Sequence, residues 1–282
     1  MINISMNPVI FLGIRWYGVM ITLSVVWLIW WMVWQIKKGT KISTDTVFTA
    51  AIVGIPSGIV FSRLLHVVDN TVIAKLHPDL AQSGRVIDYA SNPGLIIGGS
   101  GLTIYGAVLG AALGIWIYSK FSKIKFGYFL DMAAPGIVIA QAIGRIGCTI
   151  NGCCYGVTST SWGIFYSNPN SLAPLGTLTQ PATVYEMAFL LLLFPVLLKL
   201  RGRLQPDGSL FLVYLALYSL GRFNIDFMRN GDPFLFNLHQ AQIVSLIVIA
   251  IAISFLSVRT KWIKQETEGT IPETEALPQE KP

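Results

Sequence analysis

The sequence predicts an all-α integral membrane protein with seven transmembrane helices, an external N-terminus and a cytoplasmic C-terminus. Of its 282 residues, 53% are hydrophobic and only 12% are charged, and the mean hydropathy is +0.61. Soluble domains carry about 25% charged residues. Uncharged apolar runs recur along the chain, and a helix of about 20 residues crosses the roughly 30 Å hydrocarbon core of a bilayer. These observations exclude soluble, disordered and collagen-like proteins.

Seven apolar runs define the expected helices and divide the chain into a membrane domain and a tail. In chain order the runs are 16–34, 46–65, 95–118, 132–150, 182–198, 210–227 and 241–258. Residues 1–264 are therefore expected to form one transmembrane domain. Beyond it the composition changes to Glu, Thr, Pro and Gln, which is typical of disorder, so residues 265–282 are expected to form a disordered cytoplasmic tail.

Basic residues in alternate loops predict the orientation. The loops after the first, third, fifth and seventh runs carry Lys37, Lys38, Lys41, Lys120, Lys123, Lys125, Lys199, Arg201, Arg203, Arg259, Lys261 and Lys264. The segment 151–181 has no Lys or Arg. Because Lys and Arg accumulate in cytoplasmic loops, the N-terminus is expected outside. The formal charge of +6 then needs no nucleic-acid partner, and none is expected.

Small residues predict close helix packing in the third run. Gly106, Gly110 and Gly114 follow one another at intervals of four. This spacing lets helix backbones approach closely in lipid, so we expect these glycines to serve packing.

Charged residues inside the apolar runs indicate a functional site. They are Arg63, Arg145, Glu186, Arg222 and Asp226. An Arg at the centre of a bilayer costs about 2.5–3.5 kcal/mol on insertion scales. Arg222 and Asp226 are four residues apart on one helix and could neutralise each other, with Arg229 continuing the same face.

Arg145 differs because no acidic residue follows Asp131 in its run. We expect it to be unpaired. The segment 144–156 that begins there is rich in Gly and Cys. A guanidinium fork beside flexible backbone at headgroup depth suits a phosphate, which Arg binds through two oxygens and Lys does not. Arg145 therefore predicts a site for an anionic lipid or another anionic substrate.

Six short blocks follow one another along the chain. They are Arg15-Trp16-Tyr17-Gly18, the stretch 58–64, the stretch 101–106, the stretch 144–156, Gln180-Pro181 with Tyr185-Glu186, and Tyr218 with Arg222-Phe223, Asp226-Phe227 and Arg229. In this order, over about residues 7–260, the chain resembles the prolipoprotein diacylglyceryl transferase family, bacterial membrane enzymes of lipoprotein maturation.

The resemblance implies a multi-pass protein of the bacterial inner membrane with two substrates. The diacylglyceryl group of phosphatidylglycerol passes to the lipobox cysteine thiol of a preprolipoprotein, a thioether forms, and glycerol phosphate leaves. The expected partners are phosphatidylglycerol, the lipobox segment and membrane lipid. No metal or redox cofactor is required. The leaving phosphate calls for cations on its oxygens.

The site residues follow from the blocks and from the charges in the apolar runs. Catalytic roles are expected for Tyr17, Tyr105 and Arg222. Substrate binding is expected for Arg145, Asn151, Arg63 and Glu186. Arg145 and Arg222 should meet in one pocket that opens to the outer leaflet and laterally to lipid.

Three positions depart from the family's usual residues. Tyr105 stands at a frequent His, Cys148 at an Asn and Cys153 at a Glu. Tyr105 could orient the phosphate or glycerol as a hydrogen-bond donor. Three interpretations of the cysteines stay open. Cys148 could form a disulfide with Cys153 or Cys154, or the three thiols could bind zinc, although no fourth ligand is evident. The three cysteines could also be small buried apolar residues.

Two other functions stay open from the sequence. The first is a thiol-redox membrane enzyme that uses Cys148, Cys153 and Cys154. The second is a lipid flippase or transporter with an Arg-lined passage. His66, His77 and His239 lie outside the blocks and are expected to be loop or interface residues.

Overall fold

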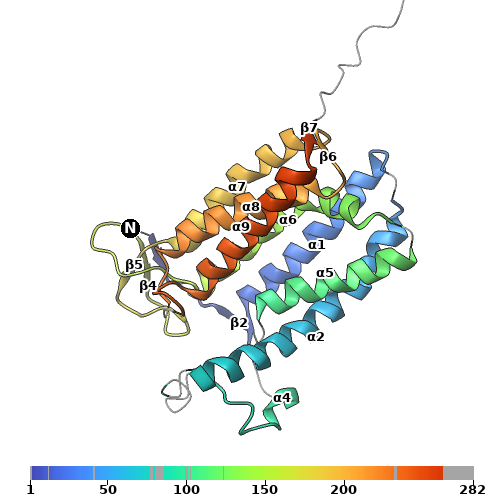
Figure 1. Ribbon diagram of the computed structural model, residues 1–282. Helices are drawn as coiled ribbons and strands as arrows, with labels where there is room; N and C mark the ends of the chain where they lie inside the picture. The colour runs from blue at the N-terminus through green and yellow to red at the C-terminus, as the bar shows by residue number, and fades with distance from the viewer. Residues whose placement is uncertain are drawn as a thin grey trace, which may run out of the picture.

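Seven long helices form the protein in the computed structural model (Figure 1). The structure describes residues 2–11, 13–40, 42–76, 79, 86–98, 101, 103–122, 124–231 and 234–262. The helices are α1 (Trp16–Lys37), α2 (Thr44–Leu76), α5 (Ile104–Phe121), α6 (Phe126–Asn151), α7 (Ala182–Leu200), α8 (Ser209–Asp226) and α9 (Gln240–Arg259). The expected tail 265–282, His77, Lys41, Lys123 and Lys264 lie outside the described residues.

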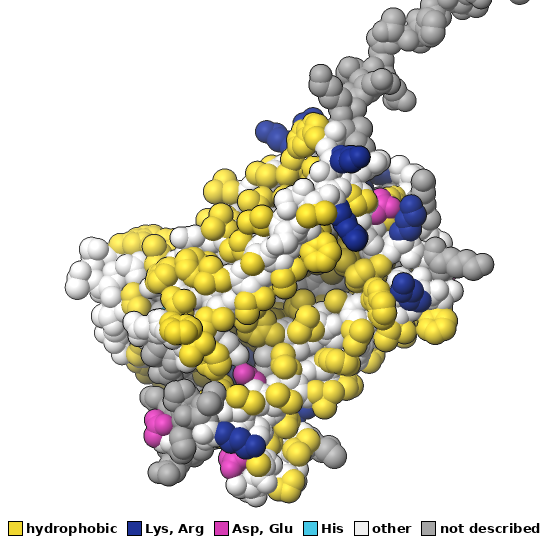
Figure 2. All heavy atoms as spheres, viewed as in Figure 1, with side chains coloured by type: hydrophobic (Ala, Val, Ile, Leu, Met, Phe, Trp, Pro, Cys, Tyr) yellow, Lys and Arg dark blue, Asp and Glu magenta, His cyan; other side chains and the backbone are white. Residues whose placement is uncertain are grey.

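Six of these seven long helices, all but α8, are apolar enough among the described residues to cross a membrane. Exposed apolar side chains such as Ile52 and Leu192 cover these helices, and hydrophobic side chains cover much of the face in Figure 2. The chain is therefore a helical, multi-pass membrane protein. The hydropathy of α8 is lowered by polar residues, among them Arg222 and Asp226.

The third expected helix begins later than the sequence predicts. A separate short helix, α4 (Leu95–Gly98), precedes it, and α5 starts only at Ile104. Gly101 interrupts the run with a φ of 114°, a left-handed conformation that Gly adopts readily and that ends a right-handed helix. The prediction that residues 95–118 form one helix is wrong for this reason. α2 also extends beyond the expected end at residue 65.

The helices pack in two groups. α1 packs on α6, α6 on α7, and α8 on both α7 and α9, while α2 and α5 form a tight pair. A Cβ atom at Gly106 would collide with the carbonyl oxygen of Phe61, and one at Gly110 with the Phe61 side chain. The close approach of α2 and α5 thus depends on these glycines, and their expected packing role is confirmed.

Buried side chains form a core on each side of α6. Trp31 and Phe129 belong to the cluster between α1 and α6, and Leu190 and Tyr214 to the cluster among α6, α7 and α8. Trp31 also donates its indole N–H to the carbonyl oxygen of Met132. α6 is thus the central helix of the larger group.

Short strands that the apolar runs do not predict lie at both ends of the bundle. β1 (Ile2–Ile4), β4 (Ile164–Tyr166) and β5 (Leu178–Thr179) form one sheet, with β1 parallel to β4 and β4 antiparallel to β5. The register pairs Ile2 with Ile164 and Ile164 with Thr179. β2 (Val9–Phe11) pairs with β3 (Ile14–Arg15) near the start of α1.

At the other end of the bundle, β6 (Leu204–Gln205) pairs with β7 (Lys261–Trp262). This pairing joins the α7–α8 connection to the end of α9 (Figure 1). Lys37, Lys199 and Arg259 are in the last turns of α1, α7 and α9. Basic side chains thus gather at this end, as Figure 2 shows.

Candidate active site

Glu186 is the centre of a charged network between α6, α7 and α8. It lies in the second turn of α7 and is 1% exposed. Arg145 Nη2 lies 2.5 Å from Glu186 Oε1, and the hydroxyl of Tyr218 donates to the same oxygen at 3.0 Å. Arg222 Nη1 lies 3.9 Å from Glu186 Oε2. The structure therefore brings Arg145 and Arg222 to one carboxylate.

The expectation that Arg145 is unpaired is wrong. Its partner Glu186 comes from the next helix, 41 residues along the chain, so inspection of α6 alone could not find it. Arg145 precedes the end of α6 at Asn151 by six residues, or about 9 Å at 1.5 Å per residue. At this depth a carboxylate partner offsets much of the cost of burying the guanidinium.

Asp226 extends the network at the end of α8. Its Oδ1 lies 2.8 Å from Arg222 Nη2 and 3.8 Å from Arg229 Nη1. The neutralising pair of Arg222 and Asp226 is thus confirmed. Three guanidinium groups, of Arg145, Arg222 and Arg229, face two carboxylates, so with His239 neutral the network keeps an excess of one positive charge.

His239 joins the same network, although it lies outside the six sequence blocks. Its Nδ1 lies 2.8 Å from Asp226 Oδ2. Its backbone N–H donates to Gln242 Oε1 at 2.9 Å in a capping box that starts α9. His239 therefore ties the start of α9 to the end of α8. No spacing signal links it to Asp226, because the two are joined through a loop.

The two expected catalytic tyrosines are near different members of the network. Tyr105, in the first turn of α5, is within electrostatic reach of Arg222, Asp226 and Arg229. Tyr17, in the first turn of α1, is within electrostatic reach of Arg145 and of Cys148. Tyr105 is half-buried, whereas Tyr17 is exposed.

Asn151 and Arg63 hold backbone segments around the network. Asn151 Oδ1 accepts a hydrogen bond of 2.8 Å from Arg15 Nη1, which connects the end of α6 to the start of α1. Arg63 donates to the carbonyl oxygens of Leu95, Ile96 and Gly101. These bonds connect α2 to the segment that leads into α5 and Tyr105.

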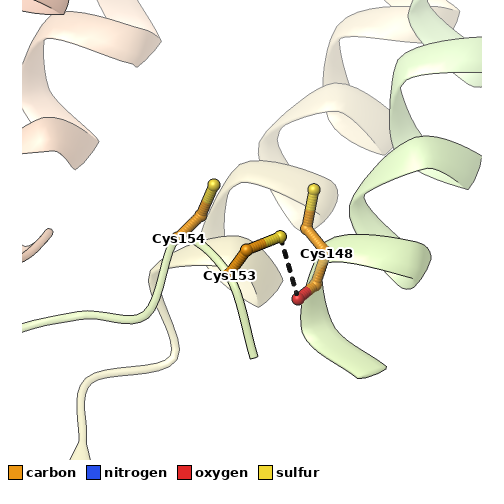
Figure 3. Close-up of side chains that lie close together, drawn as sticks. All are labelled: Cys148, Cys153 and Cys154. Atoms are coloured by element: carbon orange, nitrogen blue, oxygen red, sulfur yellow. Dashed lines mark hydrogen bonds between the residues drawn. The ribbon is translucent and has the colours of Figure 1, made fainter. Parts of the chain in front are cut away.

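Three free cysteines lie next to Arg145 at the end of α6. Their sulfur atoms are all within 4.8 Å of one another, and Figure 3 shows Cys148 at the helix end with Cys153 and Cys154 in the chain beyond it. Cys153 Sγ donates to the carbonyl oxygen of Cys148 at 3.7 Å. Arg145 Nη1 lies 3.9 Å from Cys148 Sγ.

The electrostatic surroundings of the thiols differ. Hydrogen bonds from the thiols of Cys148 and Cys153, with the charges of Arg229 and Arg145, outweigh burial and hold the pKa of Cys154 well below its usual range. For Cys153, the hydrogen bond with Cys148 lowers the pKa, but the hydrogen bond with Cys154, burial and the Cys154 charge together raise it. Cys154 is therefore the thiol that ionises most readily outside the helices.

A cavity of about 300 Å³ lies elsewhere, at the basic end of the bundle. It is lined by residues of the α6, α8 and α9 ends, among them Phe126, Gly208 and Arg259. It is not adjacent to the charged network, which lies at the other ends of these helices.

The sequence matches a family model and named relatives over nearly its whole length. A family model described as prolipoprotein diacylglyceryl transferase matches residues 6–258. A Dehalococcoides mccartyi protein named phosphatidylglycerol–prolipoprotein diacylglyceryl transferase is 46% identical over 275 residues, which are 96% of this chain and 100% of the relative.

More distant relatives carry the same name. The Clostridium tetani protein is 32% identical over 256 residues, which are 88% of this chain and 96% of the relative. The Clostridioides difficile protein is 32% identical over 256 residues, which are 89% of this chain and 94% of the relative. The chain therefore belongs to the prolipoprotein diacylglyceryl transferase family.

Proposed function

We propose that this protein transfers the diacylglyceryl group of phosphatidylglycerol to the lipobox cysteine of preprolipoproteins, the first step of lipoprotein maturation. The observation that carries the proposal is the meeting of Arg145 and Arg222 on Glu186. It creates a positively charged site near the ends of α6 and α8 in a helical membrane protein. The names of the full-length relatives give the same substrates.

The reaction is a displacement at carbon. The substrate thiol loses its proton, and its sulfur forms a bond to the carbon of the diacylglycerol unit that carries the phosphate. The bond from that carbon to the phosphate oxygen breaks. The electron pair stays on that oxygen, and glycerol phosphate leaves. The largest electrostatic demand is therefore at the phosphate, where preorganised cations lower the barrier.

Arg222 and Arg145 are suited to hold this phosphate. Arg222 Nη1 is buried and, within the described part of the chain, has no hydrogen-bond partner. A buried donor without an acceptor is costly, so a phosphate oxygen would complete its bonding. Arg145 uses Nη2 for Glu186, and the five N–H groups of a guanidinium leave further donors for a ligand.

The other expected residues take supporting roles in this proposal. Tyr105 and Tyr17 orient the phosphate and glycerol oxygens through their hydroxyl groups. Glu186 fixes both arginines, and Asn151 positions the end of α6 through Arg15. Arg63 takes part in substrate binding by holding the turn that precedes Tyr105 in the chain.

We further propose seven crossings of the bacterial inner membrane, with the network at the outer end. The basic end formed by α1, α7 and α9 then faces the cytoplasm. α8 crosses the membrane packed against α7 and α9. Residues 265–282 form a cytoplasmic tail. Figure 2 shows a hollow with a hydrophobic rim between α9 and α5. Such a hollow suits lateral entry of a lipid.

The test is transfer by the purified protein. It is incubated in detergent with phosphatidylglycerol and a lipobox peptide, and the peptide is weighed by mass spectrometry. A mass gain of one diacylglyceryl group is expected, and none on a peptide with Ser in place of the lipobox Cys. Absence of the gain, under conditions where a known family member works, would refute the function.

A further inference from the structure

The three cysteines have the geometry of a metal-binding group. Their sulfur atoms lie within 4.8 Å of one another and come from one helix end and the turn after it. Two thiolates bound to one zinc ion at about 2.3 Å each lie about 3.8 Å apart in tetrahedral geometry. Small side-chain rotations would therefore bring all three sulfur atoms onto one ion.

The backbone is bent in a way that produces this group. Gly152 ends α6 with a φ of 71°, and Cys154 has a φ of 65°. A left-handed conformation is unfavourable for a residue with a β-carbon, and such residues concentrate at functional sites. The turn thus accepts strain at Cys154, and Figure 3 shows the Cys154 and Cys148 sulfur atoms pointing in the same direction, with the Cys153 sulfur directed toward Cys148.

The group supplies three protein ligands and leaves one position open. Among the described residues, no His, Asp or Glu joins the three thiols within ligand distance. The side-chain oxygen of Asn151 already accepts a hydrogen bond from Arg15. Zinc sites with three protein ligands and an open fourth position are typical of catalysis, whereas structural sites are closed by four.

The two carboxylates of the charged network are held by other groups and are not free to take a proton from a substrate thiol. Glu186 is held by Arg145, Arg222 and Tyr218. Asp226 is held by Arg222, Arg229 and His239. A free thiol has a pKa of about 8.5 and is mostly protonated near neutral pH, so the reaction needs a means of ionising it other than these carboxylates.

We propose that Cys148, Cys153 and Cys154 bind a thiophilic divalent metal ion such as Zn²⁺, and that its open position binds the lipobox thiol during transfer. The inference rests on the proposed function and departs from the expectation that no metal is required. Cys148 Sγ is 3.9 Å from Arg145 Nη1. The ion would therefore hold the substrate sulfur beside the arginine that binds the phosphate.

The chemistry balances without a change of oxidation state. A thiol bound to zinc is deprotonated, and its proton passes to solvent. The sulfur then forms the bond to the glycerol carbon while the phosphate takes the electron pair of the broken carbon–oxygen bond. The neutral thioether is a weaker ligand than a thiolate and leaves the ion. Three thiolates and a divalent ion carry one negative charge, which Arg145 and Arg229 offset.

Metal stoichiometry is the first test. The full-length protein in detergent is reduced, loaded with Zn²⁺, dialysed and analysed for metal. About one ion per chain is expected, and none in the triple variant C148S/C153S/C154S. The variant T160A, an exposed position in the same segment, should bind like the native protein.

If circular dichroism shows that the triple variant misfolds, the single variant C154S, at a half-exposed position, replaces it. C154S should lower the affinity for zinc at least about tenfold. No stoichiometric zinc in the native protein would overturn the site.

Cobalt spectroscopy tests the open position separately from activity. Co²⁺ replaces zinc, and its thiolate charge-transfer absorption is recorded while a lipobox peptide is added. The absorption should increase with the Cys peptide and stay unchanged with the Ser peptide. An unchanged spectrum with both peptides would overturn binding of the substrate thiol.

Transfer assays separate this inference from the proposed function. Chelation should lower transfer at least about tenfold, and Zn²⁺ should restore it. Full activity of the stripped protein would overturn the role of the metal but leave the function intact. If neither form transfers the diacylglyceryl group, the function fails, and the metal and cobalt measurements still decide the site.

Discussion

Arg145 of α6 and Arg222 of α8 contact the two oxygens of one buried carboxylate, Oε1 and Oε2 of Glu186. This arrangement holds two guanidinium groups from different helices close together in the membrane, where their mutual repulsion would otherwise separate them. Glu186 thus acts as a positioning residue for both. The excess positive charge that remains is available to a phosphate.

Arg145→Lys tests geometry apart from charge. Lysine keeps the positive charge beside Glu186 but lacks the planar fork that binds two phosphate oxygens. Transfer should fall at least about a hundredfold, as for loss of one preorganised donor. The rate is measured by the mass gain of a lipobox peptide. Arg203→Lys, at an exposed position of the basic end, is the matched control and should keep the native rate. A native rate in Arg145→Lys would remove the phosphate-binding role.

Glu186→Gln tests the central carboxylate. Glutamine has nearly the same shape, but it leaves Arg145 and Arg222 without the charge that they share. Removal of one partner of a buried ion pair costs about 3–5 kcal/mol, so the unfolding free energy in detergent should fall by about this amount. Added phosphatidylglycerol should restore part of the loss, because its phosphate supplies a negative charge, and zwitterionic lipid should not. Equal stability of variant and native protein would contradict the central role of Glu186.

Local spacing and apolar length are sufficient to predict much of this protein. The seven long helices follow from apolar runs, the Arg222–Asp226 pair follows from its spacing of four, and Gly106 and Gly110 indicate the α2–α5 contact. Each of these features depends on residues within one helix. The ordered blocks add the family, because they carry the site residues of several helices at once.

Features that depend on packing between distant segments are not visible in the sequence. Glu186 meets Arg145 only because α6 and α7 pack at that level, and His239 reaches Asp226 through a loop. β1 pairs with β4 in a register that places Ile2 opposite Ile164. Strands of two or three residues are too short to show a recognisable pattern in the sequence. The break at Gly101 is hidden because glycine is also frequent inside membrane helices.

Gly110→Leu tests the contact of α2 with α5. A Cβ atom at Gly110 would collide with the side chain of Phe61 and lie 2.7 Å from the carbonyl oxygen of Ser57. Overpacking of this kind costs about 1–3 kcal/mol, so thermal unfolding in detergent should occur at a lower temperature. Gly94→Ala is the control, because a Cβ atom there has nothing within 4 Å. An unchanged transition in Gly110→Leu would show that α2 and α5 are not held together at this point.

Alkylation as a function of pH tests the electrostatics of the cysteine turn. The pKa of Cys154 is lowered, so its thiolate persists as the pH falls, whereas the raised pKa of Cys153 keeps that thiol protonated. Only thiolates react readily with iodoacetamide, and an ordinary thiol is almost fully protonated at about pH 6. At that pH the chelator-treated, reduced protein should be modified at Cys154 at least about tenfold faster than at Cys153. Peptide mapping by mass spectrometry identifies the labelled residue. Zn²⁺ added before the reagent should protect Cys154 if the three thiols bind it, and faster labelling of Cys153 would contradict the assigned order of ionisation.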